Sequence, residues 1–389
     1  MTASKKNERH LLDNAEKIRM IDSESQFEMM MRWPMLLNEA IERAEQLPLP
    51  EKVILRSRTL QYQQDFSNVL ICGMGGSAIG GAYAEAYFRD YLDIPIVISK
   101  KHHPPGFVSP STLVIVCSYS GNTEETIQNF LAVVDRKAPV IAISSGGMLT
   151  NYCENLGIPI LRLASGYRPR ASLPLLFPPI PILISRIVRS FDYSSDFNEA
   201  INLISKMQDE LSPSSAFSVN PAKQVAASIA GTIPMVCSAV GCLSYRMRCQ
   251  LNENSKLPAM DLEFPELGHN HIMGLESHPR NLSQLSLIIL ALKSEEKAIS
   301  ARADYLKELA SDLNIPVHSF EAQGNSLLAQ MLSLTYFGDY VSLYASVLRG
   351  IDPSSTTTID TMKAKIEQEQ PWKKSADEKY RLLISSNEI

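Results

Sequence analysis

Short apolar runs alternate with amphipathic stretches between residues 69 and 163, and this alternation constrains the fold more than any other feature of the chain. The runs have the length and β-branched content of buried strands, and they cover residues 69–72, 94–99, 113–117, 140–144 and 158–163. The stretches between them, for example residues 124–135, have the apolar spacing of helices. Strands that alternate with helices form a parallel sheet with helices on both faces. We therefore predict an α/β fold.

The second half of the chain has a similar design without repeating the residues. After a predicted helix at 197–211, strands are predicted at 233–238, 285–292 and 315–320, with helices at 295–313 and 327–349. The run 285–292 also fits a buried helix. A proline-rich segment that begins at Pro169 is predicted to be an irregular linker, because proline lacks a backbone donor and interrupts regular structure.

These patterns predict four consecutive parts in a chain of 389 residues, which is long enough for two domains. Helical spacing predicts a helical lead-in, and the two alternating regions predict one α/β domain each. The remaining C-terminal segment ends in a polar stretch, 373–389, for which no fold is predicted. The predicted boundaries are 1–60, 61–190, 191–350 and 351–389.

Composition and charge exclude several classes of protein. An apolar content of 45% and a charged content of 20% are typical of a globular domain, and a net charge of −5 argues against a nucleic-acid-binding surface. No apolar stretch is long enough to cross a membrane, and the N-terminus has no apolar signal region. The six cysteines form no Cys-x-x-Cys pair, which predicts free thiols and a cytoplasmic location.

Three hydroxyl side chains, Ser118, Ser120 and Thr123, lie between the run 113–117 and the predicted helix 124–135. Unpaired backbone N–H groups and the positive end of the helix dipole favour an anion at such a helix start. Ligands of parallel sheets also bind beyond the carboxyl ends of the strands. The alternative is an ordinary capping box, in which Ser120 or Thr123 caps the helix, but a cap explains one hydroxyl and not three. The segment therefore predicts a phosphate site.

A glycine-rich turn, residues 73–81, directly follows the first predicted strand of that sheet. It nearly matches the dinucleotide-binding fingerprint, which also requires an acidic residue after the second strand to hold a ribose. That strand ends instead in Ser99-Lys100-Lys101-His102, which has no carboxylate. Two alternatives remain: backbone amides and Ser77 approach a substrate closely, or the turn is tight and binds nothing.

Two further groups of polar residues are candidates for chemistry. Arg168 and Arg170 follow the run 158–163, and a guanidinium can bind an oxyanion through paired hydrogen bonds. The polar segments 250–256 and 266–271 are more often a solvated helix face and loop, yet a carboxylate of one and an imidazole of the other that converge can move protons at neutral pH. His269 and His271 alone are a weak indication of a metal site, because no third ligand is positioned by spacing.

These segments, taken in order, resemble one family: the bifunctional phosphoglucose/phosphomannose isomerases, which are built from two sugar-isomerase (SIS) domains. The resemblance runs from about residue 69 to residue 363. It implies two SIS domains, each a parallel sheet flanked by helices in a flavodoxin-like or Rossmann-like three-layer sandwich. The segments on which the resemblance rests are GMGGSAIGG at 73–81, SYSGNTEET at 118–126, SSGG at 144–147, RPRAS at 168–172, NENSK at 252–256, HN at 269–270 and GIDPSS…MK at 350–363.

The resemblance also implies roles for individual residues. The substrate and its phosphate would be bound by Gly76, Ser77, Ser118, Ser120, Thr123 and Arg170. Glu253 matches the catalytic base, and Arg170 also lies beside the reacting carbons. His269 matches a ring-opening histidine that similar enzymes take from the partner subunit, and Lys363 matches a lysine that assists ring opening. The family's usual His-Asn-Glu is His269-Asn270-His271 here, which bears on how His269 is oriented.

The activity implied is the reversible isomerisation of glucose 6-phosphate, and of mannose 6-phosphate, with fructose 6-phosphate. An enediol intermediate would form with Glu253 as the base, without metal or other cofactor. A homodimer is implied, because a histidine donated across an interface requires one. Two alternatives are a non-catalytic SIS regulator that binds sugar phosphate and a different SIS sugar-phosphate isomerase; the joint presence of Glu253 and His269 favours an enzyme.

Overall fold

The computed structural model describes residues 11–55, 58–293 and 295–384, and contacts divide these residues into two compact units. One unit contains residues 11–34 and 194–355, and the other contains residues 35–193 and 356–384. Residues 1–10 of the predicted lead-in and residues 385–389 of the predicted C-terminal segment lie outside the described residues. The four predicted domain boundaries stay predictions.

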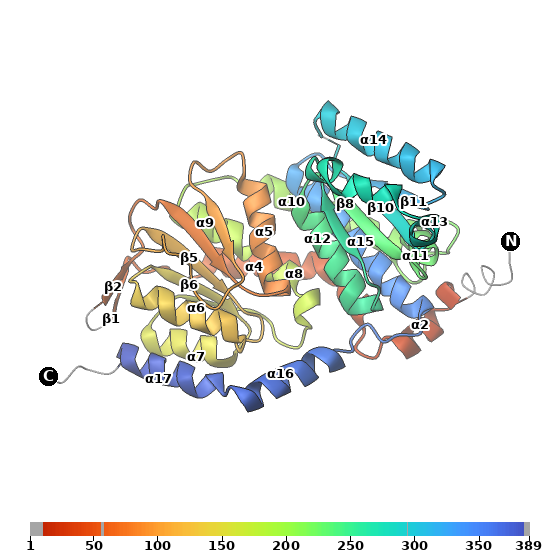
Figure 1. Cartoon of the computed structure of the whole chain (residues 1–389). Coiled ribbons are helices and arrows are strands. Elements are labelled where there is room, and N and C mark those ends of the chain that lie inside the picture. The colour runs from red at the N-terminus through yellow and green to blue at the C-terminus, as the bar shows by residue number, and fades with distance from the viewer. Residues whose placement is uncertain (1–10, 56–57, 294, 385–389) are drawn as a thin grey trace. The chain divides into compact units, whose positions relative to one another are not determined.

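Residues 35–193 and 356–384 are built around a five-stranded parallel sheet, in the order β4-β3-β5-β6-β7 (Figure 1). Counted along the chain this order is 2-1-3-4-5, the flavodoxin-like arrangement. The central strands β5 and β6 are buried along their whole length, which explains why they are apolar on both faces. The strands are β3 (Asn68–Cys72), β4 (Ile96–Ser99), β5 (Thr112–Cys117), β6 (Val140–Ser144) and β7 (Ile160–Arg162).

Helices cover both faces of this sheet. One layer contains α5 (Gly76–Phe88) with α8 (Leu173–Leu176) and α9 (Pro179–Ile187), which contact one another. The other layer contains α6 (Glu124–Asp135), α7 (Gly147–Leu156) and α17 (Trp372–Ile384) (Figure 1). The unit also includes α4 (Trp33–Gln46), which begins at the boundary with the other unit, and α16 (Thr357–Glu369). The predicted three-layer α/β architecture is confirmed.

Residues 194–355 form a second, four-stranded parallel sheet in the order β11-β10-β8-β9. Read from β9 and numbered along the chain, this order is 2-1-3-4, which matches the first four strands of the other sheet. The two sheets therefore share one design. The run 285–292 is a strand, not a buried helix. The strands are β8 (Ile233–Ser238), β9 (Met260–Glu263), β10 (Leu285–Ala291) and β11 (Val317–Glu321).

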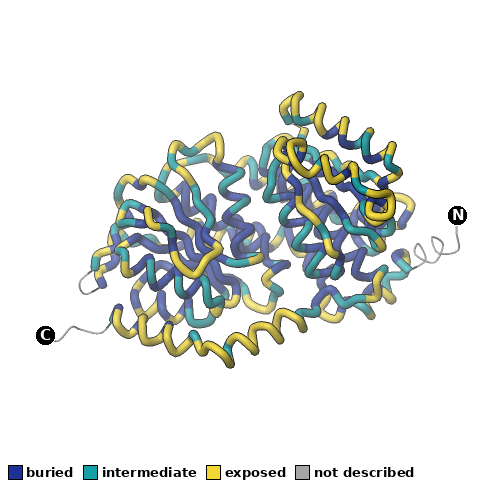
Figure 2. Tube along the Cα trace, in the orientation of Figure 1, coloured by how far each residue is buried: buried dark blue, intermediate teal, exposed yellow. Residues whose placement is uncertain are grey.

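Helix α15 is the central helix of this unit and is buried over nearly its whole length, as its dark trace in Figure 2 shows. It contacts α10, α11 and α12, whereas α14 lies against β11 and packs on a separate apolar cluster. The short helices α2 and α3 belong to this unit too. The helices are α2 (Ala15–Ile21), α3 (Gln26–Met31), α10 (Ser194–Leu211), α11 (Pro221–Ile229), α12 (Gly241–Gln250), α13 (Pro279–Leu282), α14 (Lys297–Asp312) and α15 (Leu327–Leu348).

Strand β9 was not predicted, and two predicted segments also differ from the structure. The end of the predicted helical lead-in is an antiparallel hairpin of β1 (Lys52–Leu55) and β2 (Arg58–Gln61). The prediction of an irregular proline-rich linker is wrong: the segment forms η1 (Pro169–Ala171), α8 and α9, and α8 and most of α9 are buried. Each of these elements has proline in its first turn, where a helix needs no donor from that residue.

The six cysteines are free thiols, as predicted. Burial raises the pKa of Cys72 and Cys237 to about 12, so these two are weak nucleophiles at neutral pH. Within the described ranges, no helix has the length and apolar character needed to cross a membrane.

Candidate active site

The hydroxyl segment lies at the topological switch point of the five-stranded sheet. Strands β3 and β5 are neighbours, and the chain leaves them in opposite directions along the sheet. The glycine-rich turn follows β3, and Ser118 follows β5, so both predicted ligand segments meet at the carboxyl edge of the same strand pair. In parallel α/β sheets, ligands bind in the crevice that this strand order creates.

The three hydroxyls of this segment have different surroundings. Ser118 is buried, and its Oγ donates to the Thr123 Oγ1 at 3.1 Å. Ser120 is exposed, and its Oγ accepts from the Asn122 N–H at 3.3 Å. Thr123 occupies the N-cap position of α6, yet its side chain makes no capping hydrogen bond. The capping-box alternative therefore does not describe this helix start, whose first-turn N–H groups have no side-chain cap from Thr123.

Two carboxylates in the first turn of α6 partly balance the positive end of its helix dipole. Glu124 and Glu125 lie in the first turn of α6, where they interact favourably with the helix dipole. Burial raises the pKa of the Glu124 carboxyl, and His102, whose Nε2 lies 3.8 Å from the Glu124 Oε1, acts in the opposite direction.

The SSGG segment at 144–147 and the residue after it hold the hydroxyl segment through hydrogen bonds. The Ser145 Oγ donates to the Tyr119 carbonyl at 2.6 Å, and the Met148 N–H donates to the Asn122 Oδ1 at 3.0 Å. Gly121 has a φ of +66°, and a Cβ added there would lie 1.7 Å from the Gly146 carbonyl oxygen. No larger residue fits this position, so glycine is required by the close approach of the two loops.

The glycine-rich turn brings Arg170 to the same edge of the sheet. A Cβ on Gly76 would lie 2.4 Å from the Pro169 carbonyl oxygen and 3.3 Å from the Arg170 nitrogen. The first turn of α5 and the short helix η1 therefore pack backbone to backbone. The Arg170 side chain is itself buried, with 5% of its surface exposed. Ser77, also buried, accepts a hydrogen bond from the Tyr119 N–H at 3.1 Å.

Tyr119 is an organising residue that sequence reasoning did not single out. Its hydroxyl donates to the Ala164 carbonyl at 2.8 Å and accepts from the Tyr167 N–H at 2.9 Å. Burial raises the pKa of this phenol, so it stays protonated and able to donate. Tyr119 thus ties the hydroxyl segment to the loop that leads to Arg170. Its position between two serines in SYSG was the available signal.

Glu253 lies in the other unit, on a single turn of π-helix, η2 (Leu251–Ser255), that extends α12. Such turns are rare and occur frequently at functional sites. Lys256, which ends the turn, has a φ of +56°, a left-handed conformation that non-glycine residues seldom adopt. The Glu253 side chain is partly exposed.

Two contacts hold this turn against the rest of its unit. The Asn254 Nδ2 donates to the Ser342 Oγ of α15 at 2.9 Å. The Lys256 Nζ donates to the Ser355 carbonyl at 2.9 Å and also to the carbonyl of Glu253. Because Asn254 and Ser255 are buried while Glu253 is not, the turn is anchored on one side and presents the carboxylate on the other.

His269 is exposed at the end of a short 3-10 helix, η3 (Glu266–His269), and a second one, η4 (His271–Glu276), follows. Asn270 links the two. Its Oδ1 accepts from the backbone N–H of His271 and lies 2.6 Å from the His271 Nδ1, and its Nδ2 donates to the Glu266 Oε1 at 2.5 Å. His271 is therefore oriented by Asn270.

The fold separates Glu253 from His269 within one chain. Strands β8 and β9 are parallel, so α12 and η2 return the chain from the carboxyl end of β8 to the amino end of β9. Glu253 precedes β9, whereas His269 follows its carboxyl end. With four residues, this strand spans on the order of 10 Å. Glu253 therefore lies toward the amino edge of this sheet and His269 toward its carboxyl edge.

Lys363 lies in the middle of α16, a helix in which no residue is buried and whose trace is almost entirely yellow in Figure 2. Its position is compatible with a side chain that reaches outward from the unit. Among the residues that the structure describes, no group of three or more His, Cys, Asp or Glu side chains is arranged to hold a metal ion.

Two family models match the chain. Residues 63–153 match the SIS domain, and residues 218–366 match the bacterial phospho-glucose isomerase C-terminal SIS domain. The two matches fall on the two parallel sheets, so the prediction of two SIS domains is confirmed. A hypothetical protein of Thermus thermophilus has a similar structure, with a TM-score of 0.70 at 13% identity, covering 94% of this chain and 96% of that one.

Curated relatives give a closer likeness. A bifunctional phosphoglucose/phosphomannose isomerase of Caldicellulosiruptor bescii is 33% identical over 308 residues, which cover 78% of this chain and 91% of that protein. The corresponding isomerase of Thermoplasma acidophilum is 31% identical over 303 residues, 77% of this chain and 90% of that protein. The chain therefore belongs to the family of bifunctional phosphoglucose/phosphomannose isomerases.

Proposed function

We propose that the chain is an isomerase that interconverts glucose 6-phosphate and mannose 6-phosphate with fructose 6-phosphate. The observation that carries the proposal is the segment at the switch point of the first sheet. It combines a buried Ser118 bonded to Thr123, an exposed Ser120 and a helix start without a capping bond from Thr123. That arrangement suits a phosphate bound by neutral donors.

In this proposal the phosphate binds to Ser118, Ser120 and Thr123, and the sugar extends toward Gly76, Ser77 and Arg170. The packing of Gly76 on the backbone of η1 supports this, because it brings the arginine to the turn that would face the sugar. A guanidinium at that position stabilises the negative charge that develops on the C1 and C2 oxygens during proton transfer.

Glu253 is the proposed base. Its carboxylate removes the proton from C2 of the open-chain aldose, and an enediol forms between C1 and C2. A proton passes from the O2 hydroxyl to O1 in this intermediate, and return of the first proton from Glu253 to C1 then gives the ketose, so the protein ends the cycle unchanged. The π-turn supports this role, since it presents the carboxylate from an anchored backbone, which preorganises the base.

His269, assisted by Lys363, is proposed to open the sugar ring. Because His269 and Glu253 lie toward opposite edges of one sheet, the histidine that completes a site would come from a partner subunit of a homodimer. The exposure of His269 fits a residue that reaches into a second chain. A cytoplasmic location, where sugar phosphates are metabolised, is part of the same proposal.

A coupled assay on purified, metal-chelated protein tests the function. Fructose 6-phosphate is supplied, and the formation of glucose 6-phosphate and of mannose 6-phosphate is followed separately. Formation of both products establishes the bifunctional isomerase, and glucose 6-phosphate alone restricts it to a phosphoglucose isomerase. If neither product forms while fructose 6-phosphate still raises the melting temperature, the chain is a sugar-phosphate-binding regulator.

A further inference from the structure

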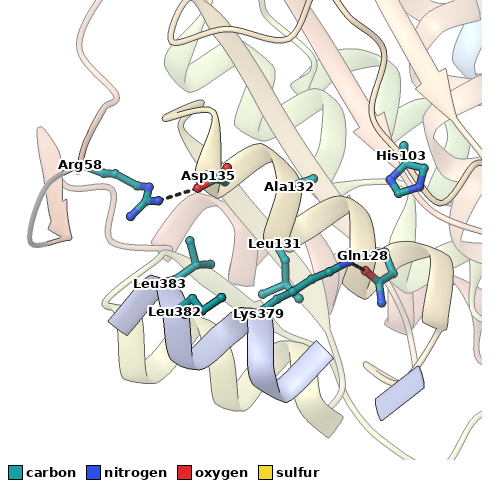
Figure 3. A pocket seen from close by; sticks show the side chains of 9 residues that line it. All are labelled: Arg58, His103, Gln128, Leu131, Ala132, Asp135, Lys379, Leu382 and Leu383. Atoms are coloured by element: carbon teal, nitrogen blue, oxygen red, sulfur yellow. Dashed lines mark hydrogen bonds and ion pairs between the residues drawn. The ribbon is translucent and has the colours of Figure 1, made fainter. Parts of the chain in front are cut away.

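A groove of about 320 Å³ lies between α6 and α17 and runs along α6 from Gln128 to Asp135. Figure 3 shows the side chains that line it. The volume falls within the range of small-molecule sites in proteins. None of the residues that line the groove belongs to the proposed active site, so the groove needs an account of its own.

The centre of the groove is apolar. Leu131 of α6 and Leu383 of α17 are buried and form its floor, as Figure 3 shows, while Leu382 remains 73% exposed at its side. An exposed leucine beside a preformed apolar floor can bury its surface against an apolar ligand without any change of fold.

The two ends of the groove have different charges. At one end, Arg58 and Asp135 form an ion pair at 2.5 Å and neutralise each other. At the other end, the Lys379 Nζ donates to the Gln128 Oε1 at 2.7 Å, a neutral partner, and in the described part of the chain it contacts no carboxylate. His103 lies near Gln128 at this end, as Figure 3 shows, and has no hydrogen bond or ion pair among the described residues. The lining therefore carries an uncompensated positive charge at one end.

From this arrangement we infer that the groove between α6 and α17 binds a small organic anion, with its carboxylate or phosphate at Lys379 and His103 and its apolar part over Leu131 and Leu382. The positive charge at one end favours a ligand with a negatively charged group, and the apolar floor disfavours a ligand that is hydrophilic throughout. Helix α6 begins at the proposed phosphate segment and ends in this groove, so one rigid helix joins the two sites.

Isothermal titration calorimetry with octanoate tests the inference, because octanoate combines one carboxylate with an apolar chain. Octan-1-ol, which has the same chain without the charge, is the ligand control. We expect saturable binding of octanoate to the full chain, and binding of octan-1-ol weaker by about tenfold or more.

Two variants locate the site. Lys379→Glu reverses the charge at the proposed anion end and should weaken octanoate about tenfold or more, and Leu382→Asp should do the same by making the centre polar. Leu382 and Lys379 are exposed, so both variants should fold, which a melting curve checks. Lys374→Glu is the matched control: it makes the same charge change on an exposed lysine of the same helix that does not line the groove.

Several outcomes would overturn the inference. Equal binding of octanoate and octan-1-ol would show that the charge plays no part. Unchanged octanoate binding in Lys379→Glu, or an equal loss in Lys374→Glu, would place octanoate elsewhere. If octanoate does not bind and sedimentation shows that Leu382→Asp dissociates an oligomer, a second copy of the chain covers the groove.

Discussion

The Asn254 Nδ2 donates to the Ser342 Oγ at 2.9 Å, and this bond joins the turn that carries Glu253 to the buried helix α15. Both side chains are buried, so water does not replace the bond if one partner is removed. The bond therefore sets where the neighbouring carboxylate lies, although neither residue has a role in the proposed chemistry.

We expect Ser342→Ala to lower kcat about tenfold while KM changes little, because small misplacements of a catalytic group reduce the rate more than substrate binding. Ser346→Ala is the matched control. Ser346 is one turn further along α15 and equally buried, and among the described residues its hydroxyl bonds to the Leu343 carbonyl of its own helix. Steady-state kinetics on both variants decides the point. Equal loss of kcat in the two would mean that the effect comes from helix packing and not from the bond to Asn254.

Replacing the proposed base tests the chemistry directly. Glu253→Gln keeps the size of the side chain and removes its ability to accept a proton, so kcat for fructose 6-phosphate should fall by ~10²–10⁴. Binding of fructose 6-phosphate, measured by calorimetry, should be nearly unchanged. Glu308→Gln, at an exposed position of α14, should leave both unchanged. Turnover close to that of the unmodified protein in Glu253→Gln would remove Glu253 from the role.

Much of the fold could be predicted because local patterns suffice for it. The helix predicted at 124–135 has those bounds in the structure, and so does the strand predicted at 233–238, since apolar runs and helical spacing are local properties. The proline-rich segment was predicted wrongly because proline density indicates irregular structure on average. Here, however, prolines fall in first turns, where helices tolerate them.

The hydroxyls of the candidate site could be predicted for the same reason, since strand, turn and helix start are adjacent in the chain. The role of Tyr119 could not, because its hydroxyl bonds to Ala164 and Tyr167, which only the folded chain brings near. The π-turn around Glu253 depends on contacts with Ser342 and Ser355 and has no local signature. Long-range packing determines both features.

The close approach at Gly76 leads to a third prediction about the site. Gly76→Ala would place a methyl group 2.4 Å from the Pro169 carbonyl oxygen. Because the atoms that it meets belong to the backbone of Pro169 and Arg170, no side chain can turn aside and η1 must move. We expect a loss of about 1–3 kcal/mol in the free energy of unfolding and a raised KM for fructose 6-phosphate as Arg170 shifts. Gly106→Ala is the control, since nothing lies within 4 Å of a Cβ there. Unchanged KM in Gly76→Ala would show that the packing does not position Arg170.

The docking of α17 on α6 and α7 depends on an aromatic stack. The rings of Tyr152 on α7 and Tyr380 on α17 lie 4.1 Å apart and are nearly parallel, at 8°, and the Tyr152 hydroxyl bonds to Asp377. Tyr380→Ala should therefore loosen α17, with faster amide hydrogen exchange in this helix and unchanged exchange in β5. Lys374→Ala, on an exposed position of α17, should leave exchange in the helix as it is. Equal exchange of α17 in the two variants would mean that other contacts hold it.

A glutamate of α10 that binds the start of α15 makes the stability of the second sheet's unit depend on pH. The Glu199 carboxylate accepts from the N–H groups of Asn325 and Ser326, at 2.7 and 2.9 Å, and these bonds hold its pKa below the ordinary value of 4.5. A folded pKa below the unfolded one means that the ionised carboxylate stabilises the fold. This contribution is complete at neutral pH and is lost as pH falls through the folded pKa.

Glu199→Gln should therefore lower the melting temperature at pH 7, and the difference from the unmodified protein should shrink as pH falls below about 4.5, where the unfolded carboxylate begins to protonate. Melting curves between pH 7 and pH 3 measure this difference. Glu308→Gln, whose carboxylate is exposed on α14, should show no such trend. A difference that stays constant over the whole range would contradict the assignment, because a bond to an ionised carboxylate must weaken when that carboxylate is protonated.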